Sequence, residues 1–175
     1  MSTDNRNELF DLVDGSDRVL GTVKRGDTNT NPALIHRAVA IMVFDERGRL
    51  FLQKRSRSKD TYPGYWSISA SGHVKSGETY PQAAIRELQE ELGIKRPPKF
   101  KRLHKVLIRY PDETEFEVFF TVTVNGPLKL DEEEIETGTW FTLNRRFFRN
   151  TLEKIKITPE LKVIVENFLT KAAGS

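Results

Sequence analysis

The segment Gly72–Ile94 constrains this chain more than any other part of its sequence, because a loop containing glycines runs directly into a helix with clear start and stop signals. Thr79 is a suitable N-cap, and Gln82 three residues later completes a capping-box pattern. Gly93 is the residue type that most often follows the end of a helix. We therefore predict a helix over Thr79–Leu92. Its apolar stripe consists of residues at helical spacing, namely Ala84, Ile85, Leu88 and Leu92.

Three glutamates at positions i, i+3 and i+4 of this helix, Glu87, Glu90 and Glu91, share one face. Helical geometry places that face roughly 100° or more away from the apolar stripe. Like charges at these spacings destabilise an isolated helix. A hard divalent cation would offset the repulsion, and Mg²⁺ shared with substrate phosphates is the natural candidate. From these three residues alone, the alternative is a solvated acidic helix face.

The residues around the three glutamates complete the pattern G-x5-E-x7-R-E-U-x-E-E-x-G-U, in which U is an aliphatic residue. Its nine fixed positions are Gly72, Glu78, Arg86, Glu87, Leu88, Glu90, Glu91, Gly93 and Ile94. From average residue frequencies, a chance match in a chain of this length is on the order of 1 in 10⁷. The segment resembles the Nudix box without departure from its pattern, and the family fold would extend from Ile35 to Thr142.

The resemblance to the Nudix family implies roles for the box residues. Glu90 and Glu91 would bind Mg²⁺, or Mn²⁺ in its place, and Glu87 would be either a further ligand or the base that deprotonates water. A backbone carbonyl near Gly72 would join the metal shell. The implied reaction is hydrolysis of a diphosphate linkage, in which metal ions neutralise phosphate charge and a carboxylate activates water.

Two other pairs of box residues have structural roles that follow from their chemistry. Gly72 and Gly77 let the loop before the helix turn tightly. Glu78 and Arg86 are too far apart in the sequence to pair as helix neighbours. We expect them to pair where the loop folds back over the first turns of the helix, which would fix the metal-binding loop.

Substrate contacts are also expected outside the box. Arg55 and Lys59 precede it and are candidates for holding phosphate oxygens, with a solvated basic loop as the alternative. Five aromatic residues could stack on a base, although such residues belong more often to cores: Tyr62, Tyr65, Trp66, Phe116 and Trp140. An acidic loop could supply a distal base or be a solvated turn, and it contains Glu133, Glu134 and Glu136.

Three stretches, Leu34–Val39, Gln53–Trp66 and Ser71–Val74, are similar to one Nudix branch, which contains isopentenyl-diphosphate isomerases and the hydrolases related to them. Isomerases of this branch hold a metal with histidines and two glutamates away from the Nudix helix. The resemblance implies a second metal or diphosphate site at matching positions, namely His36, His73, Glu115 and Glu117. Strand alternation puts both glutamates on one face. The alternative is that the histidines are hydrogen-bonded structural residues.

One departure argues against isomerase chemistry. The isomerases use a cysteine next to the G-H pair, whereas this chain has Ser71 there and no cysteine at all. A hydroxyl is a far weaker acid than a thiol, whose pKa lies near 8.5. A third histidine upstream of His36 is also missing. We therefore expect a hydrolase acting on a nucleoside di- or triphosphate or a related nucleotide. The alternatives are an isopentenyl-diphosphate isomerase and a catalytically inert nucleotide-binding module.

The hydrophobic patterning predicts an α/β (α+β) fold. Strands are expected over Leu9–Val13, Arg18–Val23, His36–Phe44, Leu50–Gln53, Trp66–Ser71, Phe100–Arg109, Glu115–Val124 and Gly138–Thr142, with a polar loop at Gly26–Pro32 and a second helix at Pro159–Leu169. The Nudix resemblance makes this an α/β/α sandwich with a mixed central sheet. We expect a single domain over residues 1–175, with a core at about 35–145, an N-terminal β-hairpin at about 9–24 and a C-terminal helix at about 158–172.

Composition excludes several other classes. The chain has 175 residues, a formal net charge of +3 and no cysteine, which excludes disulfides and thiol chemistry. Its longest apolar stretch, Ala38–Phe44, is far shorter than the roughly 20 residues of a membrane helix, and Met1–Glu8 lacks the apolar segment of a signal peptide. We therefore expect a cytoplasmic protein with a small-molecule diphosphate substrate, and neither a nucleic-acid polymer nor a membrane as partner. The oligomeric state stays open, with a homodimer among the options.

Overall fold

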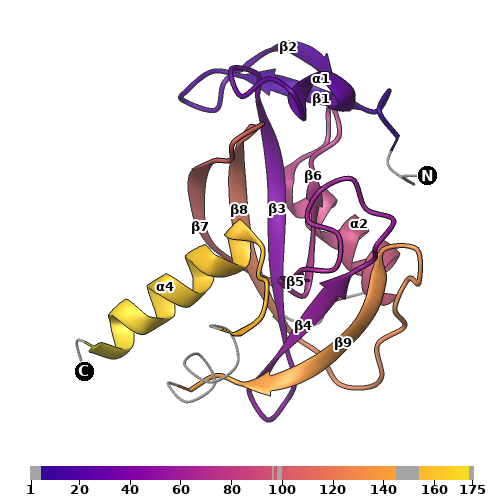
Figure 1. Cartoon of the computed structure of the whole chain (residues 1–175), viewed down its shortest axis with the longest axis vertical. Coiled ribbons are helices and arrows are strands. Elements are labelled where there is room, and N and C mark those ends of the chain that lie inside the picture. The colour runs from indigo at the N-terminus through magenta and orange to yellow at the C-terminus, as the bar shows by residue number, and fades with distance from the viewer. Residues whose placement is uncertain (1–4, 96, 98–99, 145–153, 174–175) are drawn as a thin grey trace.

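The computed structural model describes residues 5–95, 97, 100–144 and 154–173, with side chains described up to residue 166. In this part of the chain, seven strands form one mixed sheet around two long parallel strands, β3 (Ile35–Phe44) and β8 (Thr114–Thr123) (Figure 1). β7 (Phe100–Arg109) pairs antiparallel with β8. The register of the central pair sets His36 directly beside Glu115.

The other side of β3 is occupied by two strands. β6 (Ala70–His73) pairs antiparallel with its first half, and β4 (Arg49–Arg55) meets its far end. β4 in turn pairs antiparallel with β5 (Trp66–Ser67) and with β9 (Ile135–Thr142). β9 therefore begins three residues earlier than the predicted Gly138.

The strand predicted over Trp66–Ser71 is instead two strands, because β5 pairs with β4 and β6 pairs with β3. The chain leaves β4 and joins β3 at Ser69, whose buried hydroxyl accepts a hydrogen bond from the Val43 amide (2.8 Å) and donates one to the Phe51 carbonyl (2.5 Å). This hydroxyl satisfies backbone groups where the ladder is interrupted. Sequence periodicity carries no signal for such a change of partner.

Alternation along β3 builds two apolar layers. Odd-numbered residues such as Val39 and Ile41 face the helix α2 (Tyr80–Leu92), and even-numbered residues such as Ala40 face the start of α4 (Pro159–Ala173). The first layer contains Val43, Phe51, Leu88, Leu92, Val118 and Phe120, and the second contains Met42, Leu50, Leu52, Phe119 and Leu161. The predicted sandwich of helices around a mixed sheet is therefore confirmed.

The capping signals of α2 act as predicted. The Thr79 amide donates to Oε1 of Gln82 (2.9 Å), and Gly93 adopts the left-handed conformation with φ 70°. The predicted apolar stripe is wrong in one position, because Ile85 is 39% exposed. Glu87 and Glu91 are buried in the same face as Ala84 and Leu88, so the acidic and apolar faces are not separated as expected. Residues 84, 87, 88 and 91 are connected by i+3 and i+4 spacings, and helical spacing alone does not choose between two overlapping faces.

The N-terminal hairpin is confirmed as β1 (Leu9–Val13) paired with β2 (Val19–Lys24), and it lies across the ends of β3 and β6 (Figure 1). A short helix, α1 (Arg25–Thr28), overlaps the first three residues of the polar loop that was predicted over Gly26–Pro32. Among the described residues, no helix has the length and apolar character that crossing a membrane requires.

Candidate active site

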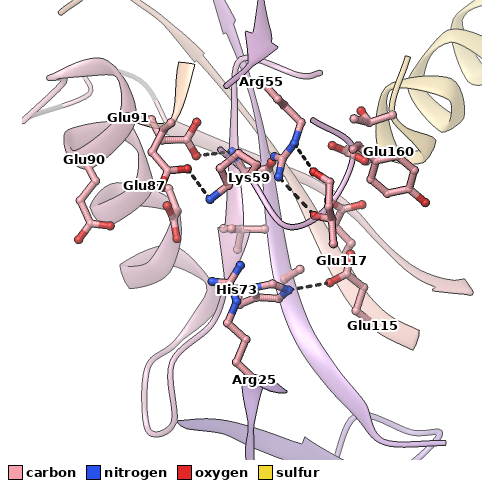
Figure 2. Close-up of a pocket in the computed structure, with 18 of the residues that line it drawn as sticks. Arg25, Arg55, Lys59, His73, Glu87, Glu90, Glu91, Glu115, Glu117 and Glu160 are labelled. Carbon is pink, nitrogen blue, oxygen red and sulfur yellow. Dashed lines mark hydrogen bonds and ion pairs between the residues drawn. The ribbon is translucent and has the colours of Figure 1, made fainter. Parts of the chain in front are cut away.

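Two groups of charged side chains face each other across a pocket of about 350 Å³. Glu87, Glu90 and Glu91 enter it from α2, and Glu115 and Glu117 enter it from β8 (Figure 2). Most other lining residues are charged or polar, including Arg25, Arg55, Lys59, Lys75, Arg86, Glu113, Glu134 and Glu160. Members of all three predicted groups of site residues, which are the box carboxylates, the histidine and glutamate set and the basic loop, therefore line one cavity. His36 is fully buried behind the lining, next to His73 and Glu115.

Glu87 packs directly against the backbone of Gly72. A Cβ atom on Gly72 would overlap the Glu87 carboxylate, so this position needs a residue without a side chain. The prediction that Gly72 serves a tight turn is wrong, because Gly72 belongs to β6 and the positive φ of the turn (79°) is found at Gly77. Close approach of a carboxylate to backbone is the physical reason for the glycine.

Glu91 is held by donors from two different strands. The side-chain amide of Gln53 on β4 donates to its Oε2 (2.5 Å), and the backbone amide of Ser71 on β6 donates to its Oε1 (3.1 Å). Gln53 is itself 2% exposed. This pair of donors fixes the orientation of the carboxylate in the pocket wall.

Arg86 connects the helix to the preceding loop. Its Nε and Nη2 atoms donate to the two oxygens of Glu78, each at 3.0 Å, and Nη2 also donates to the His73 carbonyl (2.9 Å). The ion pair expected between Glu78 and Arg86 is present. Nη1 donates to Glu87 (2.6 Å) and to Glu90 (3.0 Å), whose side chain is half exposed.

The buried carboxylates of α2 are short of positive charge. Burial, reinforced by the charge of Glu91, raises the pKa of Glu87 to about 8. Burial, reinforced by the charge of Glu134, raises the pKa of Glu91 to about 7. One guanidinium does not neutralise three carboxylates. The oxygen donors and the excess negative charge fit a hard divalent cation such as Mg²⁺.

A second cluster lies across the pocket. His36, His73 and Glu115 each offer one donor atom, and these atoms lie within 4.8 Å of one another. Oε2 of Glu115 is 3.5 Å from Nε2 of His36 and 3.8 Å from Nε2 of His73, distances that are long for hydrogen bonds. Burial lowers the pKa of His36 to about 4 and places that of His73 well below its usual value, so both imidazoles are neutral at neutral pH. Neutral imidazoles are metal donors.

Glu117 shares the pocket-facing side of β8 with Glu115, as alternation predicted, but it lies outside this three-residue group. Its Oε2 is buried and has no hydrogen-bond partner. The same is true of Nε2 of His36 and of Oε2 of Glu113, which lie 4.0 Å apart. Burial raises the pKa of Glu115 and Glu117 well above the usual range. Buried polar atoms without a hydrogen-bond partner indicate a site that binds a cation or a polar ligand.

The basic loop contributes both predicted residues to the pocket. Arg55 is oriented by hydrogen bonds to Thr61, through the carbonyl (3.1 Å) and the hydroxyl (3.3 Å). Lys59 pairs with Glu134 at 2.6 Å. The alternative of a solvated basic loop is therefore wrong for Lys59, whose side chain is 8% exposed.

Of the five aromatic candidates, Tyr62 lines the pocket and the others do not. Trp140 packs on Phe51, and Trp66 packs on Phe141. Phe116 is buried, and Tyr65 stacks edge-on against Tyr62. Of the acidic loop residues, Glu134 reaches the pocket, whereas Glu136 pairs with Lys54.

Sequence reasoning missed the lining residues Glu113 and Glu160 and also Gln53, which bonds Glu91 from behind the lining. Glu113 extends the alternation of Glu115 and Glu117 by one step, so a period-two search upstream would have found it. Gln53 is a buried polar residue at the end of an apolar run, which is a weaker signal. Glu160, at the start of α4, accepts a hydrogen bond from Ser67 (2.8 Å), and no local pattern connects it with the pocket.

The chain is similar to known proteins in sequence and in fold. The NUDIX domain family model matches residues 34–161. An uncharacterized Nudix hydrolase of Pseudomonas aeruginosa is 38% identical over 128 residues, which are 73% of this chain and 75% of that protein. The isopentenyl-diphosphate Delta-isomerase of Streptomyces avermitilis is 38% identical over 140 residues, 77% of this chain and 71% of that protein. The crystal structure of DR0079 from Deinococcus radiodurans is similar with a TM-score of 0.78 and 25% identity, over 91% of this chain and 98% of that one.

Proposed function

Because this chain belongs to the Nudix family, whose model matches residues 34–161, we propose that it is a Mg²⁺-dependent hydrolase that cleaves a diphosphate linkage in a nucleoside di- or triphosphate or a related nucleotide. One observation carries the proposal: Glu87 and Glu91 are buried side by side in a pocket wall, one against Gly72 and the other against Gln53. Two carboxylates that are buried in this way are unfavourable unless a cation compensates them.

The residues that would hold the cation are Glu87, Glu90 and Glu91, together with a backbone carbonyl near Gly72. A bound Mg²⁺ supplies charge neutralisation at the diphosphate oxygens and at the leaving phosphate. Mn²⁺ has similar ligand preferences and is expected to substitute for it.

Arg86 and Glu78 are positioning residues in this account, because their ion pair joins the loop to the helix on either side of the metal ligands. Glu87 has two candidate roles, a further ligand or the base that takes a proton from water. Arg55 and Lys59 line the same pocket as the α2 carboxylates and would bind phosphate oxygens. Lys59 would then exchange its contact with Glu134 for the substrate.

The lining of the pocket favours a polar organic group in the substrate. The apolar side chains in the lining are Ala38 and Val39, and the ring surfaces are those of Tyr62, Tyr110 and His73. A nucleotide offers a polar sugar and a ring that stacks on tyrosine. A branched hydrocarbon chain would bury little apolar surface here and gain little from it.

The second cluster is proposed as a site for a further divalent ion or for the substrate diphosphate. His36, His73 and Glu115 provide two neutral nitrogens and one carboxylate, a donor set that suits Mn²⁺ or Zn²⁺ better than Mg²⁺. Glu117 faces the same space and would contact a ligand bound there.

The isomerase alternative has support from the Streptomyces avermitilis relative, but Ser71 argues against it. Ser71 lines the pocket where the isomerases have cysteine, and its backbone amide is bonded to Glu91. A hydroxyl does not replace a thiol in proton transfer to carbon at neutral pH. The alternative of a catalytically inert nucleotide-binding module would not explain why the complete set of box carboxylates is present.

The test is a hydrolysis screen with Mg²⁺ over nucleotides, dinucleoside polyphosphates, nucleotide sugars and isopentenyl diphosphate. We expect release of phosphate or a nucleoside monophosphate, and loss of rate on the order of 10²-fold or more in Glu91→Gln. Glu132→Gln, at an exposed position, is the matched control. Isomerisation of isopentenyl diphosphate, or tight nucleotide binding without turnover, would contradict the proposal.

A further inference from the structure

Three consecutive residues of β1 contact either the two histidines of the second cluster or the turn that leads from β6 to α2. The carbonyl of Leu9 accepts a hydrogen bond from the Ser76 amide (2.8 Å). The ring of Phe10, which is fully buried, stacks on His36 (5.4 Å between ring centres) and packs at a tilt against His73 (4.7 Å). β1 lies outside residues 34–161, the part of the chain that the family model matches. The hairpin therefore lies outside the matched domain and contacts both the two histidines and the turn before α2.

Asp11 makes the most specific of these contacts. Its Oδ1 accepts hydrogen bonds from the Ser76 hydroxyl (2.8 Å) and the Gly77 amide (3.2 Å), and its Oδ2 pairs with Arg37 (3.3 Å). Ser76 and Gly77 form the turn between β6 and α2, where Gly77 has a φ of 79°. A carboxylate that accepts two hydrogen bonds from one turn restricts the conformation of that turn more than a single hydrogen bond would.

The turn that Asp11 restrains leads directly to the α2 carboxylates. The Lys75 amide donates to Oε2 of Glu78 (3.1 Å), and Glu78 holds Arg86 through two hydrogen bonds. Arg86 in turn contacts Glu87 and Glu90. A continuous series of polar contacts therefore runs from Asp11 through the turn to the carboxylates that face the pocket.

The hairpin also contacts the domain through Asp17, and these contacts do not involve the turn at Ser76 and Gly77. Asp17, in the turn after β1, pairs with Arg37 (2.6 Å) and Lys105 (2.8 Å) and accepts a hydrogen bond from the Tyr80 hydroxyl (3.0 Å). These contacts attach the hairpin to β3, β7 and the first residue of α2. β1 is therefore also held by contacts other than the bonds between Asp11 and the turn, with Arg37 contacting both aspartates.

We propose that Asp11 is a positioning residue for the metal-binding loop: by fixing the turn at Ser76 and Gly77 from outside the family domain, it holds Glu78 and Arg86 in place and so sets the affinity of the α2 carboxylates for a divalent ion. This inference rests on the proposed function, because it assigns Asp11 to the same metal site. Partners of this kind typically change metal affinity without touching the ion.

The experiment is a Mn²⁺ titration of the full chain, followed by the electron paramagnetic resonance signal of free Mn²⁺. The binding that Glu91→Gln removes defines the α2 site. Asp11→Ala should weaken that site about tenfold or more, and Asp11→Asn, which keeps an acceptor oxygen, should stay within about threefold of wild type. The matched control is Asp14→Ala, because Asp14 bonds Ser16 and Arg18 within the hairpin turn and none of its hydrogen bonds reaches the loop. Its affinity should be unchanged.

Wild-type affinity in Asp11→Ala, or an equal loss in Asp14→Ala, would overturn the role of Asp11 while leaving the metal site itself intact. If Asp11→Ala does not fold, Ser76→Ala removes one of the two donors from the loop side, and about threefold weaker binding is expected. Unchanged binding in Ser76→Ala would overturn the inference. A wild-type chain without the α2 site would overturn both the inference and the proposed function.

Discussion

The side-chain amide of Gln53 lies 2.5 Å from Oε2 of Glu91, so the most buried carboxylate of α2 is oriented by a neutral donor from the opposite strand β4. The Ser71 amide holds its other oxygen. A neutral donor orients a carboxylate without neutralising it, so the negative charge stays available to a cation. This relationship makes Gln53 a positioning residue for the proposed metal site.

Replacing Gln53 with Leu should therefore impair metal use while preserving the fold. We expect a loss of kcat/KM on the order of tenfold and a higher Mg²⁺ concentration for half-maximal rate. The rate is to be measured as a function of Mg²⁺ concentration, with Gln89→Leu on the exposed side of α2 as control. Wild-type Mg²⁺ dependence in Gln53→Leu would show that the hydrogen bond is dispensable.

Gly72→Ala should lower the activity while leaving the thermal stability of the chain nearly unchanged. The new Cβ would overlap the Glu87 carboxylate, which is the movable end of a side chain, so Glu87 is expected to swing away while the strand stays in place. Activity should fall on the order of 10²-fold, with little change in Tm. Gly21→Ala is the control, because nothing lies within 4 Å of a Cβ there. A large fall in Tm with retained specific activity would contradict this account.

Mg²⁺ should stabilise the chain more at high pH than at low pH. The folded-state pKa values of Glu87 and Glu91, about 8 and about 7, lie above the ordinary value of 4.5. Below about pH 4.5 the two carboxyl groups are protonated in both the folded and the unfolded chain. Between that pH and the folded-state pKa values, they ionise in the unfolded chain but not in the metal-free fold, so the fold loses stability as the pH rises. A bound cation removes this loss. The Tm increase caused by Mg²⁺ should therefore grow from pH 5 to pH 8.5.

The check is a thermal melt with and without Mg²⁺ across that range, using the Glu87→Gln, Glu91→Gln double variant as reference. The reference should show a small Mg²⁺ effect at every pH. A wild-type effect that is equal at both ends of the range would show that the two carboxylates are not the groups that bind the ion.

Glu117→Gln should stabilise the metal-free chain at alkaline pH. Glu117 is buried, its Oε2 has no hydrogen-bond partner, and burial raises its pKa well above the usual range. Because the ionised form is the unfavourable one, the penalty grows as pH rises above the unfolded pKa and is absent below it. Removing the charge should add about 1 kcal/mol or more to the free energy of unfolding at pH 8.5 and little at pH 5.

Urea unfolding in the presence of a chelator measures this difference. Glu133→Gln, at an exposed position, should leave stability unchanged at both pH values. A destabilised Glu117→Gln at pH 8.5 would show that the carboxylate already has a compensating partner in the metal-free protein.

Much of the fold followed from local signals in the sequence. The caps of α2 at Thr79 and Gly93 act through neighbouring residues, so they were predictable. The division of Trp66–Ser71 into two strands depends on where Ser69 meets Val43 and Phe51, which no local pattern encodes. Ile85 was assigned to the wrong side of α2 because two overlapping faces satisfy the same helical spacing.

In the site, as in the fold, local sequence patterns were predictable and contacts between distant segments were not. The box residues were identified by their spacing, and the histidine and glutamate set by its resemblance to the isomerase branch. The fold brings Glu87, Glu90 and Glu91 into one pocket with His73, Glu115 and Glu117. The contacts that orient them were not predictable, because Gln53, Asp11 and Glu160 reach the site from distant segments. Their roles, and the organisation of the chain as a single domain, stay predictions.

The most direct test of the central claim is anomalous diffraction from crystals soaked in Mn²⁺ with a nucleotide. The account predicts a Mn²⁺ peak at coordination distance from carboxylate oxygens of Glu90 and Glu91, with the diphosphate bound beside it. Carboxylates without an ion in crystals of a chain that still hydrolyses the nucleotide would contradict it.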